Sequence, residues 1–137
     1  MKCRIVRLTC LTIVLELIAP ALVAERSLIP SLESIPDVCS ERPNEPEWME
    51  NIALRDAYQR VLVQDIYRAQ SMERVVETGS CDCATRFPSW DSAEGTFREN
   101  HADADRSEML QASDTYNRRA NDLRPRAQAI CEAVGNW

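Results

Sequence analysis

Two cysteines on either side of one aspartate, Cys81, Asp82 and Cys83, are the residues of this chain best suited to chemistry. Such a triplet could bind a metal, exchange electrons or form structural disulfides. Zinc needs four ligands, usually from two close pairs, but the other cysteines are isolated and the chain has one histidine. A reactive dithiol needs nearby positive charge or a helix start to lower its thiol pKa, and Asp82 opposes this. The pattern therefore favours structural disulfides.

Other candidates for chemistry are sparse. Asp65 lies on the apolar face of a predicted helix and needs a partner there, with His101 and the arginines as candidates, unless it sits at the rim. His101 and Asp105 share a helix face, but two ligands do not make a metal site. The sequence contains no catalytic triad order, phosphate-binding loop or zinc-protease motif. We therefore expect no enzymatic activity, no cofactor and no metal.

Trp90 and Trp137 are the candidates for contact with a protein partner, because tryptophan is enriched among the residues that dominate binding energy. Trp90 is close in sequence to Pro88 and the loop cysteines, so we expect it to pack over the disulfide region. Trp137 follows the last predicted helix, where it is easier to expose.

The start of the chain predicts export. Residues 1–24 combine a basic beginning with a short apolar stretch that ends in small residues, which is typical of a cleaved signal peptide. Cleavage after Ala24 is the main expectation; cleavage after Ala21 and a retained anchor are the alternatives. Cys3 and Cys10 leave with the signal, so four of the six cysteines remain. In a small exported chain, four cysteines favour two disulfides.

The pairing of Cys39, Cys81, Cys83 and Cys131 stays open, because four cysteines allow three connectivities. A single long helix between Cys39 and the loop would separate them by about 45 Å, which the short stretch after Cys39 cannot span. One alternative joins Cys39 to Cys131 and leaves the loop cysteines bonded to each other or free. We favour the arrangement in which each loop cysteine bonds one distant cysteine. This arrangement requires the long helix to bend or break.

Helical patterns dominate the rest of the chain, which has three glycines and no alternating strand pattern. Closely spaced prolines predict an extended arm over residues 25–46. One helix of about 30 residues is predicted over 47–77, followed by a connection over 79–96 and a second helix over 97–123. Pro125 then ends or kinks that helix, or opens a new one. The final predicted apolar face consists of Ala127, Ile130, Cys131 and Val134.

The expected fold is all-α: a helical hairpin or small bundle over residues 47–137, with a Pro-rich N-terminal arm and disulfide staples. If the signal ends at Ala24, 113 of the 137 residues remain, which suits one domain. Removing the signal also leaves 13 basic and 21 acidic residues, a net charge of −8. Such an acidic chain is unsuited to nucleic acid, so the expected partner is a protein.

The export signal, the CDC triplet, the FPSW segment and the acidic helix after it resemble small exported accessory proteins of conjugative type IV secretion loci. The resemblance covers residues 81–94 and the general layout, and it implies a periplasmic helper rather than an enzyme. We therefore expect a periplasmic or secreted protein that acts through protein contacts, with a role in secretion or cell-envelope assembly and no stable membrane span after signal cleavage. A thiol-disulfide or metal-handling protein that uses Cys81 and Cys83 is the alternative.

Overall fold

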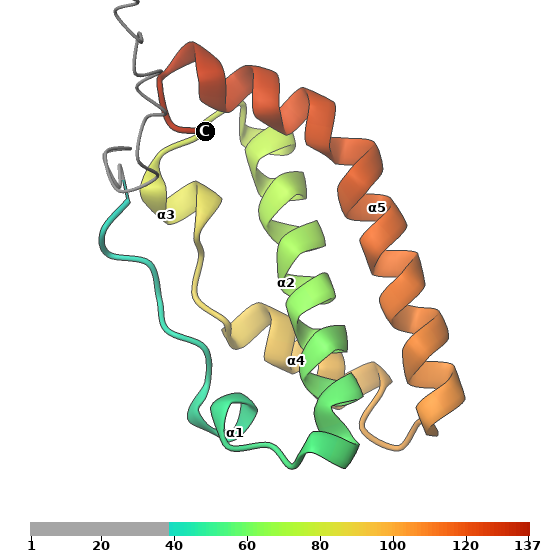
Figure 1. The fold of residues 1–137 in the computed structure, drawn as a ribbon. Coiled ribbons are helices and arrows are strands. Elements are labelled where there is room, and N and C mark those ends of the chain that lie inside the picture. Colours follow the sequence, from blue (N-terminus) through green and yellow to red (C-terminus); the bar gives the residue numbers. More distant parts are fainter. Residues whose placement is uncertain (1–38) are drawn as a thin grey trace, which may run out of the picture. The chain divides into compact units, whose positions relative to one another are not determined.

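The computed structural model describes residues 39–137, and this part of the chain contains helices, turns and extended connections without a strand. In chain order the elements are α1 (Glu47–Glu50), the 3-10 turn η2 (Leu54–Asp56), α2 (Ala57–Thr78), α3 (Cys83–Arg86), α4 (Asp91–Asn100) and α5 (Arg106–Ala133). The two long helices, α2 and α5, lie side by side, and the chain between them carries α3 and α4 (Figure 1). The expected all-α fold is confirmed. The predicted signal peptide (1–24) and most of the predicted arm lie outside the described residues.

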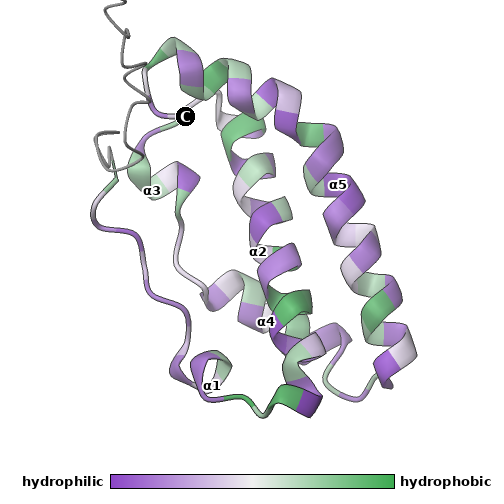
Figure 2. Ribbon diagram, in the orientation of Figure 1, coloured by the Kyte–Doolittle hydropathy of each residue, from purple (hydrophilic) through white to green (hydrophobic). Residues whose placement is uncertain are grey.

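A hydrophobic core holds the long helices together. Leu62, Val63 and Ile66 of α2 are completely buried and pack with Phe97 of α4 and Met109 of α5. Their spacing of one, three and four residues places them on one face of α2. Figure 2 shows hydrophobic and hydrophilic residues interspersed along α2 and α5, as expected of amphipathic helices. None of the helices within residues 39–137 has the length and apolarity that crossing a membrane requires.

The prediction of one helix over residues 47–77 is wrong, because the chain leaves the helical path after α1. α1 is a single turn that ends with Asn51 as its cap, and an extended link and η2 precede α2. The break lets Met49 turn into the core, where its side chain is completely buried. It also shortens the long helix to 22 residues, which corresponds to about 33 Å by helical rise.

The part of the arm that the structure describes runs back along the bundle from Cys39 to α1 (Figure 1). Glu45 fixes this course: its carboxylate pairs with Arg60 at 2.7 Å and accepts a hydrogen bond from Gln64. Even fully extended, the eight residues from Cys39 to Glu47 would cover about 26 Å, which is most of the length of α2 but far less than an unbroken 30-residue helix. The break in the helix and the position of Cys39 are therefore linked, as the distance argument required.

The prediction of one helix over residues 97–123 is also wrong, because a turn over residues 101–105 separates α4 from α5. Asp105 begins α5 with a capping box. Its side chain accepts a hydrogen bond from the backbone N–H of Glu108, and the Glu108 side chain accepts one from the backbone N–H of Asp105. This exchange satisfies two donors that a helix start would leave unpaired. The Asp-x-x-Glu capping motif therefore starts a new helix, although the helical spacing of the sequence continues across it.

Pro125 neither ends the last helix nor begins a new one, since it lies inside α5. The last turns of α5 swing across the end of α2 (Figure 1), which is the kink expected from a proline within a helix. The swing carries Cys131 toward the loop that follows α2. Ala127 and Cys131 of the predicted final face are buried, whereas Val134 is 65% exposed.

Candidate functional site

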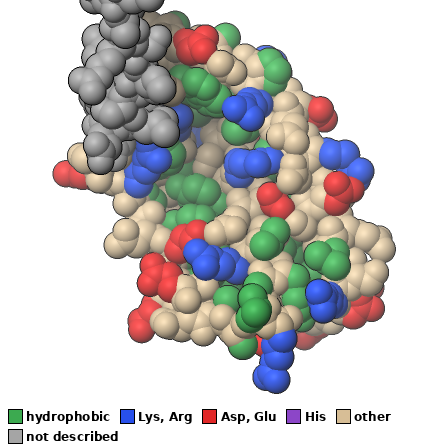
Figure 3. Space-filling model, in the orientation of Figure 1, with side chains coloured by type: hydrophobic (Ala, Val, Ile, Leu, Met, Phe, Trp, Pro, Cys, Tyr) green, Lys and Arg blue, Asp and Glu red, His purple; other side chains and the backbone are tan. Residues whose placement is uncertain are grey.

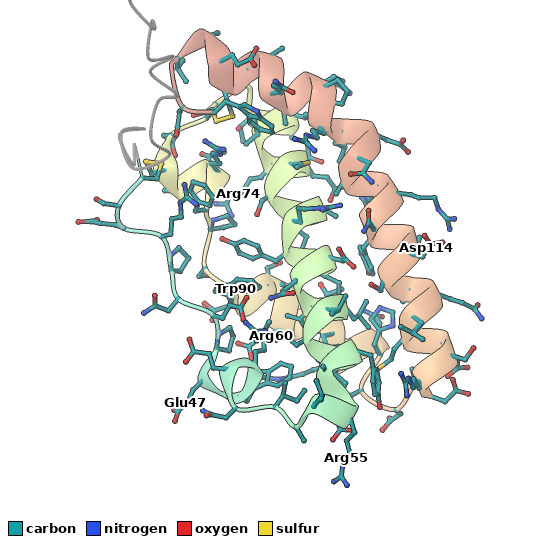
Figure 4. The ribbon with its side chains drawn as sticks, viewed as in Figure 1. Glu47, Arg55, Arg60, Arg74, Trp90 and Asp114 are labelled. Atoms are coloured by element: carbon teal, nitrogen blue, oxygen red, sulfur yellow. A yellow bond between two sulfur atoms is a disulfide. The ribbon has the colours of Figure 1, made fainter. Side chains whose placement is uncertain are left out.

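The cysteines of residues 39–137 form two disulfides at one end of the bundle. Cys39 is bonded to Cys83 and Cys81 to Cys131, with Cα–Cα separations of 5.5 and 5.1 Å. Each loop cysteine therefore has one distant partner, which is the arrangement that the sequence favoured. Figure 4 shows both sulfur bridges near α3, where the arm, the loop after α2 and the end of α5 meet. We call this region the disulfide-linked end.

Three of the four bridged cysteines are packed into the protein, and Cys83 is partly exposed. Cys39 and Cys81 are each 3% exposed and Cys131 is completely buried. Cys81 and Cys131 belong to a small apolar cluster with Val75 and Ala127. Thiol–disulfide exchange needs access of a thiolate to one of the sulfurs, and this packing restricts that access. Among residues 39–137, no three His, Cys, Asp or Glu side chains are grouped so that they could hold a metal ion.

Asp82, between the two bridges, caps a helix. Its side chain accepts a hydrogen bond from the backbone N–H of Thr85 at 2.7 Å and so starts α3, and the Ser80 hydroxyl donates a second one at 2.8 Å. The hydrogen bond from Ser80 and then those from Thr85 lower the pKa of the Asp82 carboxyl. The Cys-Asp-Cys triplet therefore consists of two cysteines in separate disulfides and, between them, an aspartate that caps α3.

Replacing Asp82 by asparagine tests this cap. Asparagine still accepts the hydrogen bonds but cannot ionise. Because folding lowers the pKa of Asp82, its ionisation stabilises the fold fully above the unfolded-state value of 3.8, and this contribution is lost as the pH falls through the folded-state pKa. We expect urea unfolding to show that wild type is more stable than Asp82→Asn at about pH 6, and that the difference shrinks below about pH 4. A difference independent of pH would contradict this role.

Asn136, in the turn after α5, contacts one cysteine of each disulfide. Gly135 has a left-handed φ of 71°, the usual geometry just after a helix, and it turns the chain back after α5. Asn136 is 5% exposed. Its side-chain amide donates a hydrogen bond to the carbonyl of Cys81, and its Oδ1 lies 3.4 Å from the sulfur of Cys39. The sequence prediction missed Asn136, although a Gly-Asn pair after a helix was an available signal.

Arginines and aromatic rings alternate at this end of the protein. The guanidinium carbon of Arg42 lies 4.2 Å from the ring centroid of Phe87, and that of Arg86 lies 5.0 Å from Phe87 and 5.0 Å from Trp137. The guanidinium carbon of Arg124 lies 6.0 Å from the ring centroid of Trp137. These separations are within cation–π range. We call these five residues the arginine–aromatic cluster.

Arg86 is at the centre of this cluster. Its Nη1 donates hydrogen bonds to the carbonyl oxygen and to Oδ1 of Asn136, and these are its only hydrogen bonds among the described residues. Burial, followed by the charge of Arg42, lowers the pKa of the Arg86 guanidinium. Both effects disfavour the positive charge, and no carboxylate of residues 39–137 offsets them. The cluster therefore favours an added negative charge, in a chain whose own net charge is −6.

A cavity of about 180 Å³ lies against the cluster, between α2, α5 and the end of α3. Its lining is mostly apolar. The lining includes Tyr67, Met72, Arg86, Phe87, Cys131 and Trp137. Figure 3 shows hydrophobic side chains with arginines beside them in the upper half of one face of the molecule. An apolar cavity with a few polar groups is the usual composition of a ligand site.

The two tryptophans predicted for partner contact lie in different surroundings. Trp137 lines the cavity and is 40% exposed. Trp90 does not pack over the disulfides, so that expectation is wrong. Its ring stacks on Tyr67 with 3.9 Å between centroids, its indole N–H donates to the carbonyl of Pro43, and it packs against the main core. Because Trp90 directly precedes α4, the link after α3 has already carried it along the bundle (Figure 4).

The other predicted candidates do not form a site. Asp65 is 9% exposed rather than at the rim, and its partner is Ser113 of α5, whose hydroxyl donates to the carboxylate; neither His101 nor an arginine takes that role. His101 lies at the end of α4, edge-on to Tyr116 with 6.0 Å between ring centroids. Since Asp105 caps α5 in the following turn, the helix face that His101 and Asp105 were expected to share does not exist.

Comparisons of the chain with protein-family models, with curated protein sequences and with solved structures find no match. The candidate for a functional surface is therefore the disulfide-linked end. Its disulfides, its arginines and its cavity bring together segments that are far apart in the sequence.

Proposed function

We propose that this protein is an exported, non-enzymatic accessory protein that binds a protein partner through its disulfide-linked end. One observation carries the proposal: the 40% exposed side chain of Trp137 lines an apolar cavity bordered by Arg86, and the exposed Val134 lies beside Cys81 and Cys83 at the same disulfide-linked end. Aromatic residues and arginine are enriched in the centres of protein interfaces. The site offers apolar contact and a charge in one place, which suits recognition rather than catalysis.

The disulfides support this role, because they hold the arm, the loop and the end of α5 in one surface. Such bonds persist in an oxidising compartment, in agreement with the signal-peptide pattern of residues 1–24. The alternative, a thiol-disulfide or metal-handling protein, would need Cys81 and Cys83 to be free or bonded to each other. Both are bonded to distant cysteines, so the support favours the binding role.

The most specific form of the proposal is a periplasmic helper in secretion or cell-envelope assembly. It rests on the resemblance of residues 81–94 to accessory proteins of conjugative type IV secretion loci. A nucleic-acid partner is unsuited to a chain whose net charge is −8 after signal removal, because the arginine–aromatic cluster is a small basic area on an acidic protein. Genes for a secretion apparatus beside this gene would support the specific form, and an unrelated neighbourhood would contradict it.

Site-specific photo-cross-linking tests the docking surface. A benzophenone amino acid is placed at Val134, at the disulfide-linked end, or at Leu110, an exposed apolar residue of α5 that lies away from it (65% and 47% exposed). In the native host, we expect a discrete cross-linked protein from position 134 and none from position 110. Equal patterns from the two positions, or no cross-link from 134, would contradict a docking role for this end.

N-terminal sequencing tests export. We expect the mature chain to begin at Glu25, or at Leu22 if cleavage follows Ala21, and to be recovered outside the cytoplasm. A chain that retains Met1 and is recovered in the cytoplasm would remove the export part of the proposal. It would leave the cross-linking result to be explained by a different compartment.

A further inference from the structure

The cavity at the disulfide-linked end has the size of one apolar side chain. Its volume is about 180 Å³, close to the roughly 150 Å³ of an engineered protein cavity that admits benzene. Met72, Phe87 and Trp137 form apolar and aromatic parts of the cavity wall. Drug-sized ligands and cofactors occupy larger pockets, of roughly 300 Å³ or more. A single side chain such as phenylalanine or leucine matches the space.

Donor groups border the same cavity. Arg86 uses only Nη1 for hydrogen bonds within the described residues, and a guanidinium has further donors on Nε and Nη2. Arg68 and Ser71 also line the cavity, and Arg68 Nε is buried without a hydrogen-bond partner in the part of the chain that the structure describes. Unpaired buried donors cost free energy. No Asp or Glu of residues 39–137 lines the cavity to balance these groups.

We propose that this cavity binds the carboxyl-terminal residue of a partner polypeptide, with its apolar side chain in the cavity and its carboxylate on Arg86. The inference rests on the proposed function, since it names the part of the partner that the disulfide-linked end holds. A carboxylate matches a guanidinium in charge and can accept two parallel hydrogen bonds from it. The rings of Phe87 and Trp137 restrict the Arg86 side chain, so little conformational entropy is lost when the carboxylate binds.

Fluorescence anisotropy with short peptides tests this inference. The probes are a fluorescein-labelled Gly-Gly-Ser-Phe peptide with a free carboxylate, the same peptide as a carboxyl-terminal amide, and a free acid that ends in serine instead of phenylalanine. We expect the amide and the serine peptide to bind wild type roughly tenfold more weakly than the phenylalanine acid, or weaker still. Equal binding of acid and amide would overturn the inference. So would 3-phenylpropionate binding as tightly as the peptide, because the occupant would then be a small carboxylic acid.

Two variants locate the interaction. Arg86→Gln removes the guanidinium, and Met72→Trp fills the cavity while keeping Arg86; each is expected to weaken binding of the phenylalanine acid roughly tenfold or more. Arg55→Gln is the matched control, because it removes one positive charge from a residue whose side chain is 87% exposed, away from the disulfides (Figure 4). If Arg86→Gln does not fold, Met72→Trp and the acid–amide comparison decide. Unchanged binding by Met72→Trp, or an equal loss in Arg55→Gln, would overturn the inference.

Failure of this inference can be told apart from failure of the proposed function. Cross-links from Val134, combined with no discrimination between the acid and amide peptides, would refute carboxyl-terminal capture while the docking surface stands. Absence of cross-links from Val134 would remove the docking surface itself.

Discussion

Removal of the bond between Cys81 and Cys131 is expected to lower the free energy of unfolding by about 4 kcal/mol, which is close to the whole stability of a small domain. The bond joins residues 50 apart in the sequence, so without it the unfolded chain gains the freedom that loop closure had removed. The double variant Cys81→Ala/Cys131→Ala tests this without leaving a free thiol. Urea unfolding under non-reducing conditions gives the difference from wild type.

The second bond provides the comparison. Cys39→Ala/Cys83→Ala opens a loop of similar size, with a sequence separation of 44, and we expect a similar loss of about 4 kcal/mol. It also frees the arm that carries Arg42, so the arginine–aromatic cluster should loosen. If both double variants keep the melting temperature of wild type, the disulfides are not structural staples.

Leu62→Ala is expected to destabilise the protein by about 2–5 kcal/mol. Leu62 is completely buried between the long helices, so its truncation removes apolar contacts and leaves a cavity that the packed neighbours fill only in part. Leu110→Ala is the matched control, because Leu110 is 47% exposed on α5 and its truncation should cost less than about 0.5 kcal/mol. Thermal unfolding of both variants gives the comparison. Equal losses would mean that the core does not lie where α2 meets α5.

The helical nature of the chain could be predicted from residue types, whereas the positions of its two breaks were missed. Residues 47–77 contain good helix formers and neither proline nor glycine, so local propensity favours one helix. The break after α1 arises from tertiary structure: Met49 enters the core, and Cys39 must reach the far end of α2. The second break, between α4 and α5, had a signal in the sequence, because Asp105 and Glu108 form a capping box. It was missed because the helical spacing continues across residues 97–123.

The candidate site was predictable only in its cysteines and in Trp137. The sequence favoured one distant partner for each of Cys81 and Cys83 but left the pairing open, and the structure has the favoured arrangement. Arg86 and Asn136 were missed, because their importance comes from contacts between segments 50 residues apart. Sequence spacing along one helix carries no information about contacts between segments that the disulfides join.

The central claim is that the Cys-Asp-Cys triplet is a pair of structural staples, and peptide mapping of the unreduced mature protein tests it most directly. Cleavage on the amino-terminal side of Asp82, under conditions that prevent disulfide exchange, separates Cys81 from Cys83, and mass spectrometry then identifies the linked peptides. We predict one pair that contains Cys39 with Cys83, a second pair that contains Cys81 with Cys131, and no free thiol at these four positions. A bond between Cys81 and Cys83, or free thiols at both, would contradict the account.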